Sequence, residues 1–336
     1  MSDRHAASVA FLNAMGWGAA DRCFLAGDAS DRSYDRVTQA GKSAVLMDAP
    51  PGKGDDPADF IAIATHLNAL GLSAPRILAQ DLAQGFLLLE DLGDALFARV
   101  ILAQPQLESS LYTAATDVLL HLQTSPAPRD LPDLAAPQWA GAAAFALDWY
   151  RFAALGTRVD TAPFTDTLTG LIRRHADGPR VVILRDYHAE NLLWLPDRKG
   201  LARVGLLDFQ LAQMGQPGYD LVSLLQDARR DVPEMQEAAM ISRFAALSGM
   251  SGFEESYAVL GAQRALRILG VFSRLCLVAG KAQYVALIPR VWRQLWRNLA
   301  HPALAPLAEI CTTLLPEPTL ETLERIRAQC GSTRTR

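Results

Sequence analysis

The stretch LRDYHAENLL, residues 184–193, places polar side chains inside an apolar run. The polar groups that stand out are Asp186, His188 and Asn191. A surface loop has no need of the flanking leucines, and a buried strand could not satisfy so many polar groups. The pattern is therefore typical of a turn between two apolar strands that presents polar side chains to a site.

Apolar runs on both sides of this turn predict strands. VVIL (181–184) leads into the turn, and LLWL (192–195) leads out of it. RVGLLDF (203–209) follows after the short PDRKG turn, so it is expected to pair with LLWL as a hairpin. Asp208 stands near the end of that third run, one short hairpin away from Asn191.

Asp186, Asn191 and Asp208 together form a set of groups with a specific chemistry. Phosphoryl transfer from ATP uses one carboxylate to accept the proton of the attacking hydroxyl, and a second carboxylate with an amide oxygen to hold Mg²⁺. Each residue alone has a simpler interpretation as a turn former or a cap, and His188 as a histidine that supports the loop. The combination predicts a phosphotransferase.

The chain has two regions of different character. Residues 1–92 show strand-like and helical patterns in turn, whereas residues 93–336 are mainly helical apart from the polar hairpin. The elements expected in the first region are strands at 21–27, 33–39 and 42–49, a helix at 58–72 and a hairpin after Pro75. We therefore predict an α+β protein, with a small antiparallel sheet plus a helix in the N-lobe and a larger helical C-lobe.

Three motifs carry a family resemblance. The sequence ILRDYHAEN resembles the catalytic loop H-G-D-x-H-x-x-N of the aminoglycoside phosphotransferase and choline kinase-like superfamily, whose members are relatives of the protein kinases. LDF at 207–209 resembles its metal-binding I-D-F, and QPGYDLVSL with Asp220 resembles its D-P-x-Y-D-L-A segment. The resemblance implies a two-lobed protein-kinase-like fold, with Asp186 as the catalytic base and with Asn191 and Asp208 as Mg²⁺ ligands. Asp220 would brace the catalytic loop.

The N-lobe is where this resemblance places the nucleotide. GDASDRSY (27–34) joins the first two strands, and its small residues let backbone amides approach phosphates. LLLEDLG (87–93) joins the two lobes, where kinases place the adenine. The nucleotide-binding residues expected here are Gly27, Asp28, Ser30 and Arg32 in the loop, and the main chain of Glu90 and Leu92 at the adenine.

One departure from the family concerns the cation that steadies the phosphates. Kinases carry a Lys on the third strand, paired with a Glu on the next helix, but Met47 stands at the corresponding position here. The helix expected at 58–72 contains no Glu. Loss of both partners is self-consistent, because a buried ion without its partner is costly. The candidates for a replacement cation are Lys53, Arg32 and Arg36.

Four stretches resemble a narrower group, the bacterial anomeric kinases of N-acetylmuramate and N-acetylglucosamine. They are GDASDRSY (27–34), AVLMDAPP (44–51), GFLLLEDLGD (85–94) and the block from 184 to 232. The resemblance implies that one or both sugars are phosphorylated to the sugar 1-phosphate, with ATP and Mg²⁺ as cofactors, in the recycling of cell-wall peptidoglycan. The C-lobe would then hold the catalytic loop, the metal and the acceptor sugar.

The charge of the C-terminal region bears on the acceptor. From residue 251 onward there are 11 Lys or Arg against 6 Asp or Glu. Aminoglycosides are polycations that require carboxylates, so this balance favours a neutral or carboxylate-bearing sugar. Two alternatives stay open. One is a phosphotransferase for an aminoglycoside, choline or homoserine, and the other is a catalytically weak nucleotide-binding regulator, which the loss of the Lys–Glu pair would favour.

Composition sets the remaining expectations. The 336 residues carry a formal net charge of -4, which gives no electrostatic reason to expect a nucleic-acid partner. No apolar run is long enough to span a bilayer, and the beginning of the chain lacks the apolar core of a signal peptide. The four cysteines are scattered without C-x-x-C spacing, which predicts free thiols in a reducing compartment. We expect a cytoplasmic monomer without nucleic-acid or membrane partners.

Overall fold

The computed structural model describes residues 3–27 and 32–333. The chain forms two compact units: the first consists of residues 1–129 and 189–212, and the second of residues 130–188 and 213–336. The polar stretch of the sequence is divided between them, since the chain passes from the second unit to the first between His188 and Ala189. The boundary expected between an N-lobe at 1–92 and a C-lobe at 93–336 stays a prediction.

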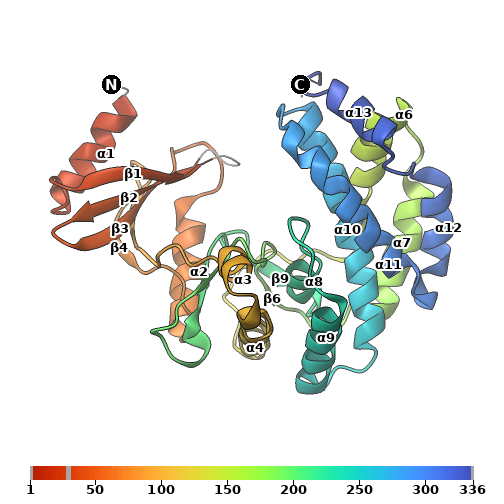
Figure 1. Cartoon of the computed structure of the whole chain (residues 1–336), viewed down its shortest axis with the longest axis horizontal. Helices are drawn as coiled ribbons and strands as arrows, with labels where there is room; N and C mark the ends of the chain where they lie inside the picture. Colours follow the sequence, from red (N-terminus) through yellow and green to blue (C-terminus); the bar gives the residue numbers. More distant parts are fainter. Residues whose placement is uncertain (1–2, 28–31, 334–336) are drawn as a thin grey trace. The chain divides into compact units, whose positions relative to one another are not determined.

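A five-stranded antiparallel sheet forms the main part of the first unit (Figure 1). Its strands are β1 (Asp21–Ala26), β2 (Ser33–Gln39), β3 (Lys42–Asp48), β4 (Ile77–Asp81) and β5 (Phe86–Glu90). They lie in the spatial order β1-β2-β3-β5-β4. The expected meander of three strands is confirmed, and the expected hairpin joins it through its second strand, β5.

Helix α1 (Asp3–Ala14) packs against one face of this sheet. Phe11 of the helix shares a buried cluster with Leu46 of β3, and its ring stacks on that of Phe86, with 5.6 Å between the ring centroids. Because side chains alternate along a strand, Met47 points to the opposite face from Leu46. Burial of this apolar surface is the main contribution to the stability of the sheet.

Helix α2 (Pro57–Ala69) follows the loop after β3. Its first turn explains where it begins, because the Asp56 side chain accepts a hydrogen bond from the Ala58 amide at 2.8 Å and proline stands at the first helical position. The helix ends three residues before the end expected from the sequence. The ring of Phe60 stacks on Phe209 with 4.9 Å between centroids, which anchors the helix to the segment that carries Asp208.

The hairpin expected after the polar turn also belongs to the first unit. Strand β7 (Leu192–Trp194) pairs with β8 (Val204–Leu206), which confirms the predicted pairing. Ser73 holds this hairpin, since its hydroxyl donates to the Ala202 carbonyl at 2.6 Å and its carbonyl accepts from the Leu206 amide at 2.8 Å. The other helical elements are α3 (Phe97–Ala103), η1 (Pro105–Leu107), α4 (Glu108–Thr124) and η3 (Gly200–Arg203).

The second unit is mainly helical (Figure 1). Its helices are α5 (Ala136–Ala143), the π-helical η2 (Ala146–Arg151), α6 (Phe152–Leu155), α7 (Ala162–His175), α8 (Tyr219–Leu225), α9 (Glu234–Ser248), α10 (Phe253–Leu277), η4 (Ala282–Leu287), α11 (Ile288–Leu299), η5 (Pro302–Leu304), α12 (Ala305–Leu314) and α13 (Leu320–Ala328). A two-stranded sheet pairs β6 (Val181–Ile183) with β9 (Gln213–Gly215).

Helix α10 is the central element of this unit and packs against α5, α7, α8 and α11. At Gly270 a Cβ atom would lie 2.2 Å from the Phe145 carbonyl carbon, so only glycine permits this close approach. The predicted class, a small sheet with a helix followed by a mainly helical region, is confirmed. In the described ranges no helix is long and apolar enough to cross a membrane.

Candidate functional site

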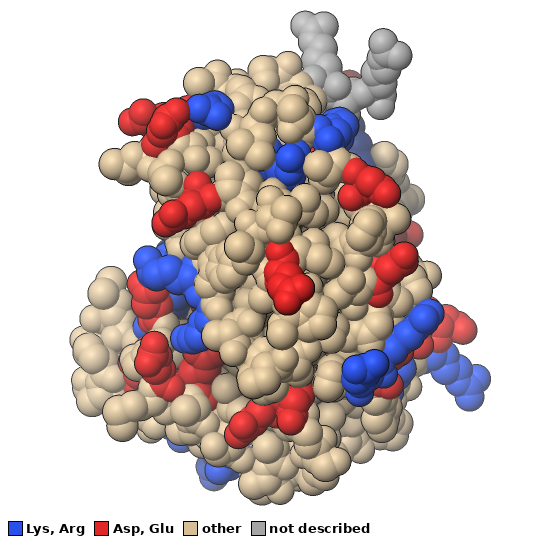
Figure 2. Space-filling model, turned by 90° about the vertical axis from the view of Figure 1, so that its right-hand side faces the viewer, with Lys and Arg blue, Asp and Glu red and all other residues tan. Residues whose placement is uncertain are grey.

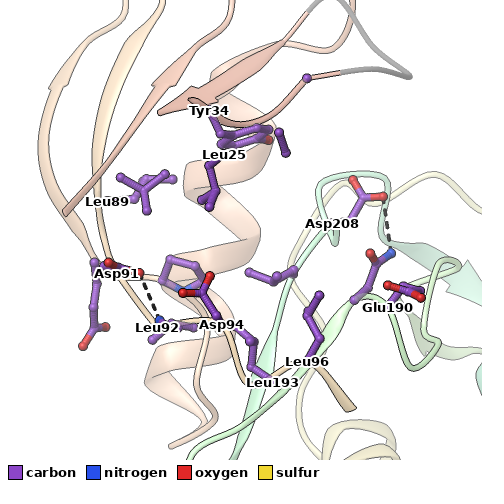
Figure 3. A pocket seen from close by; sticks show the side chains of 18 of the residues that line it. Leu25, Tyr34, Leu89, Asp91, Leu92, Asp94, Leu96, Glu190, Leu193 and Asp208 are labelled. Atoms are coloured by element: carbon purple, nitrogen blue, oxygen red, sulfur yellow. Dashed lines mark hydrogen bonds between the residues drawn. The ribbon is translucent and has the colours of Figure 1, made fainter. Parts of the chain in front are cut away.

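The first unit contains a pocket of about 440 Å³ (Figure 3). Apolar side chains from the sheet, α2 and the β7–β8 hairpin make up much of its lining, among them Leu25, Val45, Phe60, Leu89, Leu92, Leu193 and Leu207. The polar residues of the lining include Arg32, Glu90, Asp91, Asp94, Glu190, Asn191 and Asp208. An apolar surface with a few polar groups suits a ligand that has an apolar ring and a charged tail.

Asn191 and Asp208 lie side by side in this pocket (Figure 3). The Asn191 amide nitrogen lies 3.4 Å from one Asp208 carboxylate oxygen, and Gln210 donates to the other oxygen at 3.0 Å. Proteins commonly hold Mg²⁺ with one or two side-chain oxygens and leave the other positions to phosphates and water. The pair fits such a site, and among the residues described there is no group of three or more His, Cys, Asp or Glu that could hold a metal alone.

Most of the residues expected to bind nucleotide line the same pocket, namely Gly27, Arg32, Glu90 and Leu92. Asp28 and Ser30 were expected to bind it as well, but both lie outside the described residues. The structure thus brings Gly27, Arg32, the segment after β5 and the Asn191–Asp208 pair to one cavity. The individual roles of these residues stay predictions.

The surroundings of Glu90 restrict how it can contact an adenine. Its amide donates to the Arg76 carbonyl at 2.8 Å, and its carboxylate binds the guanidinium groups of Arg76 and Arg198 at 3.1 and 2.9 Å. An adenine contact through Glu90 would therefore have to use its main-chain carbonyl.

Arg36 ties the sheet to the segment after β5. Its guanidinium binds Asp91 and Asp94, each at 2.7 Å. These two carboxylates raise the pKa of Arg36, chiefly through their hydrogen bonds. Burial alone would raise the pKa of Asp91, but hydrogen bonds from Arg36, Gly93 and Ser43 lower it below its usual value. The charge of Arg36 is thus neutralised by its ion pair with Asp91, which disfavours Arg36 as the cation that binds the phosphates.

Arg32 lies directly before β2, and its side chain is 5% exposed. Its guanidinium is 3.2 Å from a carboxylate oxygen of Asp55 and 3.9 Å from one of Asp208. Sequence reasoning missed Asp55, because an acidic residue just before a helix is more simply explained as part of its N-terminal cap. The cap is in fact Asp56.

The second unit holds the loop that carries Asp186, and Asp220 braces it. The Asp220 carboxylate accepts hydrogen bonds from the amides of Leu184 at 2.6 Å and Arg185 at 2.9 Å. Ser223 donates to the Arg185 carbonyl at 3.2 Å. Asp220 is fully buried, and burial raises its pKa to about 7. This is the contact expected of a residue that supports the loop.

His188 is buried two residues after Asp186. Burial, followed by the nearby positive charges of Arg229 and Arg264, lowers its pKa to about 3. Its Nε2 atom lies 3.3 Å from the Arg229 guanidinium, so the neutral imidazole can accept a hydrogen bond there. A ring that stays neutral near pH 7 suits support of the loop or of the substrate better than proton transfer.

The sequence also resembles known proteins over most of its length. A profile of the phosphotransferase enzyme family matches residues 21–255. The N-acetylmuramate/N-acetylglucosamine kinase of Caulobacter vibrioides is 39% identical, over 91% of this chain and 95% of that protein. The protein of the same name from Pseudomonas aeruginosa is 33% identical, over 90% of this chain and 91% of that protein.

Solved structures support the fold. An aminoglycoside-3'-phosphotransferase of type VIII is similar with a TM-score of 0.52 and 20% identity, over 75% of this chain and 93% of that one. At this identity the likeness shows the fold alone. It confirms the protein-kinase-like fold expected from the motifs.

Proposed function

The chain belongs to the phosphotransferase enzyme family, and we propose that it is an ATP- and Mg²⁺-dependent kinase of N-acetylmuramate and N-acetylglucosamine. Relatives at 39% and 33% identity, matched over nearly their full length, carry that name. The product would be the sugar 1-phosphate. We place the enzyme in the cytoplasm, as a monomer that serves peptidoglycan recycling.

In this mechanism Asp186 orients the anomeric hydroxyl and accepts its proton while the sugar oxygen bonds to the γ-phosphorus of ATP and ADP departs. Asn191 and Asp208, which line the pocket of the first unit, would hold Mg²⁺ there. Bound Mg²⁺ supplies positive charge that stabilises the phosphates. The rest of the contribution of the protein is positioning, which can account for a large part of the rate of such a reaction.

The observation that carries the proposal is the Asn191–Asp208 pair in the lining of the pocket. A regulator that only bound nucleotide would need the pocket. It would not need Asp186 in a loop that a buried carboxylate, Asp220, holds by two backbone amides. The combination supports an enzyme over a nucleotide-binding regulator.

A positive side chain beside the catalytic loop bears on the acceptor. Arg229 is exposed, and its guanidinium contacts His188, two residues after Asp186. N-acetylmuramate carries a carboxylate on its lactyl group, which an arginine can bind through charge-assisted hydrogen bonds. An aminoglycoside is a polycation, and the same arginine would repel it. This contact favours the acetylated sugars.

The face of the molecule in Figure 2 gives no support to a nucleic-acid partner. Figure 2 shows acidic and basic side chains interspersed over the face that it presents, with broad uncharged areas between them. A nucleic-acid-binding surface gathers basic side chains into a patch or stripe. We propose a small-molecule sugar as the acceptor, in line with the names of the relatives.

The test is direct phosphorylation. The purified protein is incubated with ATP and Mg²⁺ and with N-acetylglucosamine, N-acetylmuramate or kanamycin in separate reactions, and sugar phosphate is followed by phosphorus NMR. We expect an acid-labile anomeric phosphate on the acetylated sugars. Phosphate on kanamycin alone would contradict the proposal, as would the absence of transfer to all three.

Asp186→Asn tests the assigned base. The amide cannot accept the proton, so turnover should fall by roughly 10²-fold or more, the range for loss of general base catalysis. ATP affinity should stay within about twofold of wild type, because we place Asp186 at the acceptor. Wild-type turnover in this variant would rule out the assignment.

A further inference from the structure

The pocket proposed to hold ATP is rich in acidic groups, so its phosphates need a cation from the protein. The acidic residues of the lining are Glu90, Asp91, Asp94, Glu190 and Asp208. Of the described residues that line it, Arg32 and Arg99 are the basic ones, and Arg99 is exposed whereas Arg32 is buried. Enzymes that transfer phosphoryl groups neutralise the phosphates with Lys or Arg as well as with metal.

The register of the sheet relates Arg32 to the position of the absent lysine. Met47 of β3 lies directly opposite Tyr34 of β2 in the antiparallel ladder. Residues directly opposite each other share a face of the sheet, as do residues two apart in an extended chain. Val45 and Tyr34 both line the pocket, so Met47 and Arg32 belong to the pocket side as well. Arg32 therefore lies on the same side as Met47, directly before the neighbouring strand β2.

Met47 itself contributes only packing. Its side chain has no exposed surface, and a thioether brings no charge to a phosphate. The guanidinium of Arg32, in contrast, lies 3.9 Å from a carboxylate oxygen of Asp208, the proposed metal ligand. A cation at this distance from the metal ligand is well placed for the phosphates that the metal would bridge.

Of the other candidate cations, Arg36 is paired with other carboxylates and Lys53 lies outside the pocket lining. Arg36 is bound by Asp91 and Asp94 at 2.7 Å each. Lys53 is exposed in the loop before α2 and is outside the pocket lining. Arg32 alone among the three candidates is both buried and part of the lining.

Asp55 accounts for how a buried arginine can be held there. Its carboxylate lies 3.2 Å from the Arg32 guanidinium, and a buried charge is tolerated when it is paired. Asp55 comes from the loop just before α2, so the pair joins the start of β2 to the start of the helix. The missing Lys and Glu would have joined β3 to this helix, and the Arg32–Asp55 pair makes a similar connection between the residue before β2 and the loop before α2.

We propose that Arg32, positioned by Asp55, is the cation that binds the phosphates of ATP in place of a lysine on β3. The proposal rests on the proposed function in that it takes ATP as the ligand of this pocket. Arg32 would contact the phosphates directly, whereas Asp55 is a positioning residue that acts through Arg32. When ATP is bound, Arg32 donates to the phosphate oxygens, and Asp208 is left to the metal.

The first experiment measures which part of ATP the arginine recognises. Dissociation constants for ATP, ADP and adenosine are determined by calorimetry in the presence of Mg²⁺, for wild type and for Arg32→Met. We expect ATP and ADP to bind on the order of 10- to 100-fold more weakly in the variant, the range for loss of a hydrogen bond to a charged group. Adenosine should bind within twofold of wild type, since it has no phosphate.

Two further variants separate a specific role from a general loss of structure. Arg32→Lys keeps the charge and should recover part of the ATP affinity, while Asp55→Asn should weaken ATP selectively and by less than Arg32→Met. Arg22→Met is the matched control. It removes another Arg–Asp pair of the same sheet, formed with Asp35 at 2.6 Å, and should leave ATP affinity unchanged.

Equal losses for ATP and adenosine in Arg32→Met would overturn the proposal, because they would indicate damage to the pocket rather than a lost phosphate contact. Unchanged ATP affinity would overturn it as well. These measurements involve no sugar, so the two proposals can fail separately. Phosphate-selective loss without any sugar phosphorylation would support Arg32 and refute the sugar kinase, and the reverse result would do the opposite.

Discussion

Replacement of Asp220 by Asn should make stability depend less on pH. Asp220 is fully buried, and its pKa is raised to about 7 from an ordinary value of 3.8, first by burial and in part by the charge of Asp186. The amides of Leu184 and Arg185 and the charge of Arg264 oppose this rise. A buried acid with a raised pKa holds its proton in the folded state over a range where the unfolded chain has already lost it.

The sign and size of the effect follow from this difference. Between about pH 4 and 7 Asp220 holds its proton in the folded state but not in the unfolded state, so its contribution to stability falls as pH rises. A difference of about 3 pH units corresponds to about 4 kcal/mol at 1.36 kcal/mol per unit. Asn does not titrate, and its NH₂ group replaces one of the two oxygens that accept from separate backbone amides, so one amide loses its acceptor. The unsatisfied buried amide costs about 1–3 kcal/mol.

We therefore expect Asp220→Asn to be destabilised relative to wild type at pH 5 by about 1–3 kcal/mol. The gap should close, and can reverse, by pH 8, because wild type loses the contribution of Asp220 over this interval and the variant has no such contribution to lose. Urea unfolding at pH 5, 6, 7 and 8, followed by circular dichroism, measures both curves. A difference between wild type and variant that stays constant across these pH values would refute the reasoning.

Asp231→Asn is the matched control for this series. Asp231 is exposed, and hydrogen bonds from Arg290 lower its pKa below the ordinary value. The stability contributed by such a group is present above its unfolded pKa and is lost only as pH falls below it. Its replacement should therefore give a small effect that does not change between pH 5 and 8.

Two further substitutions test the metal site and the acceptor. Asp208→Asn removes a charged ligand, so it should reduce turnover by roughly 10²-fold or more and raise the Mg²⁺ concentration needed for half-maximal rate. A titration of the reaction rate with Mg²⁺ measures this requirement. An unchanged Mg²⁺ requirement would contradict the proposed role of Asp208. Arg229→Gln should raise the KM for N-acetylmuramate by about tenfold or more and the KM for N-acetylglucosamine much less, because only N-acetylmuramate carries a carboxylate. Steady-state kinetics with both sugars measures the two KM values. Equal changes in both would refute a contact between Arg229 and the carboxylate.

The local part of the fold could be predicted from the sequence. Hairpins such as β7–β8 follow from two apolar runs with a turn between them, and the pairing of Leu192 with Leu206 agrees with that expectation. The position of β5 between β3 and β4 could not be predicted. A hairpin can join a sheet through either of its strands, and burial of side chains from distant elements decides between them.

The candidate site likewise combines features that the local sequence predicts with long-range contacts that it does not. The spacing of Asp186, Asn191 and Asp208 is a local signal that one sequence can display. The contact between Arg36 and Asp94 joins residues 58 positions apart, and no local pattern indicates it. Arg32 could be named as a candidate cation, but its partner Asp55 could not, since a loop acid before a helix has a simpler explanation as a cap.

Strained backbone conformations occur next to the proposed base and at the proposed metal ligand. Among the described residues other than glycine, four have positive φ: Ala40, Asp130, Arg185 and Asp208. Ala40 lies in the turn between β2 and β3, where such a conformation is common. Arg185, with φ of 71°, directly precedes the proposed base, and Asp208, with φ of 55°, is the proposed metal ligand.

Each conformation of this kind costs on the order of 1–3 kcal/mol and persists only where its surroundings enforce it. Hydrogen bonds hold both residues in place: Asp220 accepts from the amide of Arg185, and Gln210 and Asn191 donate to the carboxylate of Asp208. Neither position carries glycine, which would relieve the strain and also loosen the chain. Two of the four positive-φ residues thus lie at or next to the carboxylates proposed to act in catalysis, as expected of an enzyme whose catalysis depends on positioning.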